Sequence, residues 1–97
     1  MNIQSLMAEA NKVQKELTKI NGEIENSLFN GESGVIKVMV NGKNEVLKID
    51  ITDSTVLSDK EVLEDMIMLA VNDALSKVSK IKQEKLGKYT GGMGGLF

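Results

Sequence analysis

The sequence predicts an α+β fold in which a long helix, a small antiparallel sheet and a second long helix follow one another. Three observations lead to this fold: an apolar repeat in steps of three and four before residue 25, short stretches of alternating apolar residues around Asn41-Gly42, and a second helical pattern after Ser58. A chain of 97 residues fits one domain with a modest core. We therefore expect a single domain over 1–97, with 88–97 as a flexible glycine-rich tail.

The first helix is expected over Asn2–Glu25. Its apolar residues form a heptad-like seam, namely Ile3, Leu6, Ala10, Val13, Leu17, Ile20 and Ile24. One flank of this seam carries Glu9, Glu16 and Glu23, whereas the other flank is neutral, so opposite charges do not line both flanks as a parallel zipper requires. The seam is therefore predicted to pack antiparallel or against the second helix. The lysines on the outward side, Lys12, Lys15 and Lys19, are interpreted as members of solvated ion pairs.

The middle of the chain is predicted to form strands. A short strand is possible at Ser27–Asn30, followed by a tight connection flanked by Gly31 and Gly34. Asn41-Gly42 predicts a hairpin with a type I′ turn. A loop of two or four residues would place the core residues of both strands on one face, which are Ile36, Val38, Leu47 and Ile49. The other face is expected to be only partly polar, because it mixes Lys37, Lys48 and Asp50 with Val35, Met39 and Val46.

The second helix is predicted from Asp59 to about Gly87, with Ser58 as N-cap and Glu61 completing a capping box. Met66–Val71 are six consecutive apolar residues, more than a helix with one buried stripe can cover. Together with the half-apolar sheet face, this run predicts an obligate dimer. The residues expected in the dimer interface or core are Val35, Met39, Val46, Met66, Met68 and Leu69.

Composition excludes several classes of site. The chain lacks His, Cys, Trp and Pro, and its twelve basic residues are all lysine. Thiolate or histidine metal sites and the usual nucleophile–base pairs are therefore absent, and we expect no catalytic residue, cofactor, metal or small-molecule substrate. Asp50 and Asp53 resemble a weak Mg²⁺ site, but a role in shaping the loop is favoured. No apolar run suits a membrane span and no signal peptide is evident, so a cytoplasmic location is expected.

Positive charge gathers at the end of the second helix, in a chain whose net charge is −2. Between residues 77 and 88, five lysines face one acid, Glu84, giving a local charge of +4; the lysines are Lys77, Lys80, Lys82, Lys85 and Lys88. Lysines at a helix C-terminus also stabilise the helix dipole, which is the structural alternative. However, the apolar stripe ends at Ile81 while the helix continues, and Lys85 takes the next place on that face. We therefore expect a basic arm that projects into water and contacts DNA phosphates.

Four stretches, in order and spacing, resemble the YbaB/EbfC family of bacterial nucleoid-associated proteins: MAEANKVQKELTKI, GESGVIKVMVNGKNEVLKIDI, LSDKEVLEDMIMLAVNDALSKVSK and GGMGGLF. The resemblance covers nearly the whole chain. It implies an α-β-β-β-α subunit, a homodimer with a shared sheet and tweezer-like helices, non-specific DNA binding at the nucleoid, and no cofactor or reaction. This sequence has lysine where the family often has arginine, which we expect to preserve phosphate binding and weaken base-specific contacts.

The function predicted is that of a non-enzymatic, nucleoid-associated protein that binds duplex DNA largely without sequence specificity and alters DNA conformation or gene expression. The alternative is a protein–protein interaction module that uses the helical heptad seam and does not bind DNA directly. A membrane-surface helix is disfavoured, because the lysine-rich arm has no Trp or Phe on an opposing face.

Overall fold

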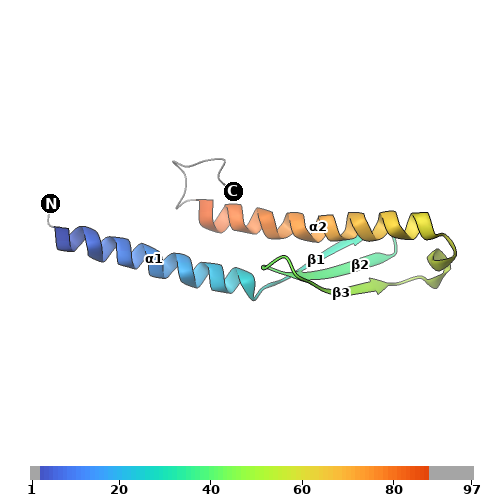
Figure 1. Ribbon diagram of the computed structural model, residues 1–97, viewed down its shortest axis with the longest axis horizontal. Coiled ribbons are helices and arrows are strands. Elements are labelled where there is room, and N and C mark those ends of the chain that lie inside the picture. Colours follow the sequence, from blue (N-terminus) through green and yellow to red (C-terminus); the bar gives the residue numbers. More distant parts are fainter. Residues whose placement is uncertain (1–2, 88–97) are drawn as a thin grey trace.

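The structure is a computed structural model that describes residues 3–87. Helix α1 (Ile3–Glu25) leads into three strands, β1 (Leu28–Ser33), β2 (Ile36–Asn41) and β3 (Val46–Ile51), and a 3₁₀ helix at Ser54–Ser58 precedes helix α2 (Lys60–Leu86). Figure 1 shows α2 lying along one side of the sheet, with α1 extending beyond the end of the sheet in the direction in which α2 ends. The predicted α-β-β-β-α order is confirmed.

The core lies between α2 and the first two strands. The sheet is antiparallel in the order β1-β2-β3. Alternate residues of β2 are buried against one stripe of α2; the buried set is Ile36, Val38, Val40, Ala70, Ala74 and Val78. The predicted apolar stripe of the second helix is therefore confirmed, and burial of these side chains is the main stabilising contribution to this two-layer arrangement.

Only the end of α1 packs on the rest of the chain. Ile24 is buried and Ile20 is half-buried, whereas the residues from Ile3 to Glu16 are exposed. Gly42, at the tip of the β2–β3 hairpin, sits against this end so closely that a Cβ atom would collide with the carbonyl group of Ile24. The predicted seam therefore packs at its C-terminal end and is uncovered in its N-terminal half.

Strand β1 is longer than the sequence predicts. Gly31 belongs to the strand rather than to a connection, and it pairs with Val38. Gly34 (φ 55°) is the first of the two residues that join β1 to β2, where a type II′ turn needs a positive φ. The expectation that Gly31 flanks the turn is wrong because Gly31 serves a close helix–strand approach instead.

The β2–β3 hairpin also differs from its predicted turn. The positive φ falls on Asn44 (64°), and the Asn41 side-chain oxygen accepts hydrogen bonds from the backbone N–H groups of Lys43 and Glu45. A β-bulge then shifts the register, so that Val40 pairs with Val46 while Met39 pairs with Lys48. The type I′ turn is therefore wrong, because the side chain of Asn41 organises a longer loop. Because paired residues share a face, Val46 lies on the side of Val40.

The start of α2 is capped by Asp59, not by Ser58. The Asp59 carboxylate accepts a hydrogen bond from the Val62 N–H group at 3.2 Å, whereas the Ser58 hydroxyl donates to the Thr55 carbonyl group. The predicted capping box is wrong because the 3₁₀ helix uses Ser58. Asp53 caps that 3₁₀ helix, and the backbone N–H of Thr55, followed by its hydroxyl group, lowers the pKa of the Asp53 carboxyl group.

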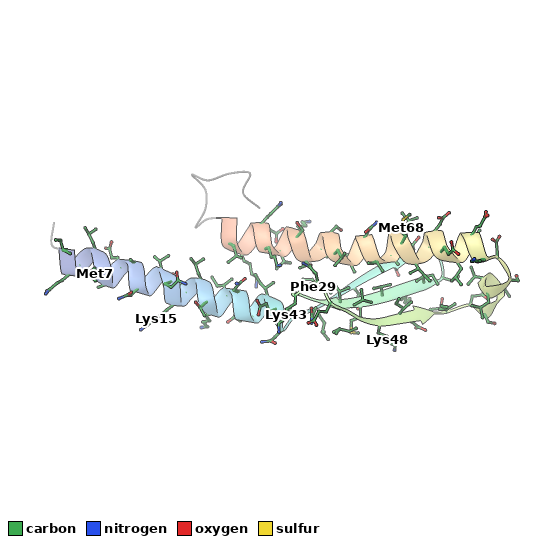
Figure 2. The ribbon with its side chains drawn as sticks, in the orientation of Figure 1. Met7, Lys15, Phe29, Lys43, Lys48 and Met68 are labelled. Atoms are coloured by element: carbon green, nitrogen blue, oxygen red, sulfur yellow. The ribbon has the colours of Figure 1, made fainter. Side chains whose placement is uncertain are left out.

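The two faces of the sheet carry different chemistry. On the face away from α2, Lys37 lies between its strand partners Glu32 and Asp50, and Lys48 points outward (Figure 2). On the face toward α2, the helix covers β1 and β2 but not β3, so Leu47, Ile49 and Ile51 remain 51%, 45% and 37% exposed. The exposed apolar surface of the sheet therefore lies over β3, on the face toward α2. The sequence pattern predicts this surface on the opposite face of the sheet.

Candidate nucleic-acid interface

The candidate interface begins where the buried stripe of α2 ends. Val78 is the last fully buried residue of the helix and Ile81 is half-buried. Lys80 and Lys85 are exposed, and Lys82 is half-buried beside Asn44 of the hairpin. The last turns of α2 extend past the sheet (Figure 1), and there Lys80 and Lys85 are exposed whereas Leu86 is half-buried.

Lys77 lies outside this group. Its ammonium nitrogen donates to the Asn30 carbonyl oxygen at 2.6 Å and lies 3.7 Å from the Asp73 carboxylate. These contacts hold the side chain against β1, although about half of it is exposed (51%). Lys88, the fifth lysine predicted to contact DNA, lies outside the described residues.

Helix α1 adds lysines to the same end of the molecule. Lys12, Lys15 and Lys19 are all exposed. A helix rotates by about 100° per residue, which places the three side chains within about 60° of one another around the helix axis. Figure 2 shows Lys15 pointing away from α2. Sequence reasoning assigned these lysines to ion pairs with neighbouring glutamates. Glu9, Glu16 and Glu23 are also exposed and lie three or four residues from these lysines, so this side of α1 carries charges of both signs, as the predicted ion pairs require.

Charge is segregated along α2. Its N-terminal half and cap carry the acids Asp59, Glu61, Glu64, Asp65 and Asp73. Lys60, the one lysine among them, lies 3.7 Å from the Glu64 carboxylate. Along α2, negative charge therefore gathers near the 3₁₀ helix and positive charge at the end that extends past the sheet.

The residues predicted for the dimer interface or core divide into two groups. Val35, Met39 and Met66 are half-buried within the chain. Met68 and Leu69 are 54% and 53% exposed, and Val46 is 45% exposed. Figure 2 shows Met68 on the side of α2 that faces away from the sheet, so the chain itself does not cover this side chain.

Other kinds of site find little support. Within residues 3–87, no group of three or more acidic, histidine or cysteine side chains is placed to hold a metal ion. Asp50 pairs across the sheet with Lys37, and Asp53 is engaged with Thr55. Neither helix in the described part of the chain contains a stretch long and apolar enough to cross a membrane.

Comparison with known proteins finds close relatives among nucleoid-associated proteins. The chain is 41% identical over 95 residues to a nucleoid-associated protein of Hahella chejuensis, covering 96% of this chain and 88% of that relative. It is 40% identical over 94 residues to the nucleoid-associated protein MCA1327 of Methylococcus capsulatus, covering 95% and 88%.

The fold is also that of a solved structure. The uncharacterized protein HP0035 from Helicobacter pylori superposes with a TM-score of 0.78 at 23% identity, covering 92% of this chain and 97% of that one. The model of the YbaB/EbfC DNA-binding family matches residues 1–93. With a helix–sheet–helix subunit, segregated lysines and this match over nearly the whole chain, the protein belongs to the YbaB/EbfC DNA-binding family.

Proposed function

We propose that the protein is a homodimer of the nucleoid, in the cytoplasm, that binds duplex DNA largely without sequence specificity through lysine–phosphate contacts. The observation that carries this proposal is the separation of charge along α2, which leaves exposed lysines at the end where both helices extend past the sheet. The contacts are assigned to Lys80, Lys82, Lys85 and Lys88, with Lys77 contributing less because it is held at β1.

The chemistry of these side chains favours backbone contacts. Lysine is a flexible point charge that suits phosphate oxygens, whereas the planar guanidinium group of arginine, which this chain lacks, is better suited to bidentate reading of guanine. DNA held in this way follows the protein surface, and changes in DNA conformation and gene expression would follow from such binding.

The homodimer is supported by surfaces that one copy leaves uncovered. On the helical wheel of α2, Val71 and Leu75 lie opposite Asp73 and Lys77, which contact β1. Val71 and Leu75 are therefore on the β3 side of the helix, next to the exposed apolar side chains over β3. A second copy that covers this surface removes apolar area from water, at about 25 cal/mol per Å². It also doubles the number of basic arms, so that two sets of lysines engage one duplex.

The test is equilibrium binding of the full chain to two unrelated duplexes of equal length over a range of salt concentrations. The expected result is equal affinity for both duplexes, with log K falling linearly with log salt at about 0.9 per neutralised phosphate. A salt-independent affinity, or strong preference for one duplex, would contradict the proposal.

The second candidate function is a protein-interaction module. It is favoured by the uncovered N-terminal half of the α1 seam, where Ile3 is 71% exposed. This reading expects no DNA binding at either low or physiological salt, so the same titration separates the two functions.

A further inference from the structure

The outer edge of β1 is occupied by side chains from α2. Because Ser33 and Ile36 flank a two-residue turn, the pairs Ser33–Ile36 and Gly31–Val38 use the backbone groups that face β2. The backbone groups of Asn30 and Glu32 therefore point to the outer edge. An uncovered edge of this kind is a template for pairing with a strand of another molecule.

Two of these outward groups have partners from one turn of α2. The Glu32 N–H group donates to the Asp73 carboxylate at 3.0 Å, and the Lys77 ammonium group donates to the Asn30 carbonyl oxygen at 2.6 Å. Asp73 and Lys77 also lie 3.7 Å apart. The Asp73 carboxylate, an acceptor, is thus paired with a backbone donor of β1. The Lys77 ammonium group, a donor, is paired with a backbone acceptor of the same strand.

The geometry of the helix on the strand makes both contacts possible. Residues four apart on a helix are separated by about 6 Å along its axis, close to the spacing of about 6.6 Å between residues two apart on a strand. Gly31 lies between the two contacts, and a Cβ atom there would collide with backbone atoms of Ala70 and Ala74. The glycine thus lets α2 approach closely enough for Asp73 and Lys77 to reach over the edge.

We propose that Asp73 and Lys77 close the β1 edge against strand pairing with another copy of this chain, and so prevent growth into a continuous sheet. An incoming strand needs the Asn30 carbonyl and the Glu32 N–H for its own ladder, and both are already bonded. The closed edge limits self-association whatever surface the protein uses for the proposed dimer. The inference goes beyond DNA binding and does not depend on it.

The decisive variant exchanges the two residues, Asp73→Lys with Lys77→Asp. It keeps composition, net charge and the four-residue spacing of an ion pair, but it sets an ammonium group against the Glu32 N–H and a carboxylate against the Asn30 carbonyl. Both edge bonds are therefore lost. The matched control is Lys60→Ala with Glu64→Ala, which removes an ion pair of the same length and spacing from the same helix, away from any strand.

Light scattering over a wide range of protein concentration, with circular dichroism to verify folding, gives the first readout. The exchanged variant is expected to form species of several times the wild-type mass as concentration rises, while the control keeps the wild-type mass. Amide exchange gives a second readout in dilute protein: the Glu32 N–H should exchange at least about tenfold faster, through loss of a charge-assisted bond.

The proposal is overturned if the exchanged variant keeps the wild-type mass throughout, or if control and variant assemble alike. If the exchanged variant fails to fold, Lys77→Met, which retains the aliphatic stem, takes its place under the same criteria. Failure of this inference leaves DNA binding untouched, because the salt titration is performed on the wild-type chain.

Discussion

Gly31 of β1 and Ala74 of α2 pack backbone against backbone, so closely that a Cβ atom on Gly31 would overlap the Ala74 amide nitrogen. This contact sets the distance between the helix and the sheet. Because α2 carries both the buried stripe and the lysines at its end, the close approach at Gly31 fixes the position of the helix for the core and for the candidate interface alike.

Replacing Gly31 by alanine is expected to destabilise the fold by about 3 kcal/mol, because α2 must move away from β1 and loosen the packing of Ala70 and Ala74. Gly22→Ala is the matched control: no atom lies within 4 Å of its Cβ position. In the interior of α1 that change should stabilise the protein by about 0.5–1 kcal/mol. Urea unfolding measures both, and equal effects would refute the close-approach explanation.

The cap of α2 gives a second prediction. Asp59→Ala removes the carboxylate that accepts the Val62 N–H, and is expected to cost about 1 kcal/mol of the free energy of unfolding. Ser58→Ala removes a hydroxyl that donates to the exposed 3₁₀ turn, and should cost less than half as much. If thermal unfolding ranks the two variants in the reverse order, Ser58 is the cap after all.

The apolar side of β3 gives a third prediction. Ile49 is 45% exposed in the single chain, so Ile49→Lys should leave the subunit folded while it shifts the protein from dimer to monomer. Leu28→Lys places the same change at another exposed apolar residue, on β1 away from the proposed contact. Sedimentation at several concentrations checks this. A dimer that tolerates Ile49→Lys but not Leu28→Lys would place the interface on β1 rather than over β3.

The order of elements follows from local patterns in the sequence. The stripe through Ala70, Ala74 and Val78 and the burial of Ile36 and Val38 each depend on residues close in the chain, and both are confirmed. Leu47 and Ile49, predicted on the same core face, are instead 51% and 45% exposed because α2 does not cover β3. What the patterns missed depends on long-range contacts. Gly31 looks like a turn residue until α2 is placed against it, and the sequence does not show that the Lys77 ammonium group reaches the Asn30 carbonyl oxygen.

The turn and the cap were mispredicted for a different reason. At the start of α2, Ser58 and Asp59 are both suitable N-cap residues, and the sequence does not rank them. At the turn, Asn41 can occupy a turn position or accept hydrogen bonds with its side chain, and it does the second. The bulge near Leu47 is likewise invisible to an alternation pattern, yet it moves Val46 to the face of Val40. Small register changes of this kind decided which surface of the sheet is left apolar.

We propose that lysines at the far end of α2, rather than the charge of the whole chain, hold DNA. The most direct test compares Lys80→Glu/Lys85→Glu with Lys48→Glu/Lys60→Glu, two variants with the same change in net charge. All four lysines are exposed. Binding to a random duplex is measured across a salt series, with the wild-type chain as reference.

The first variant is expected to lose most of its affinity for DNA. Two arms per dimer would each lose two contacts, so the slope of log K against log salt should fall by about 3.6. The second variant should bind nearly as the wild type does. Equal loss in both variants, or wild-type binding by Lys80→Glu/Lys85→Glu, would contradict the claim.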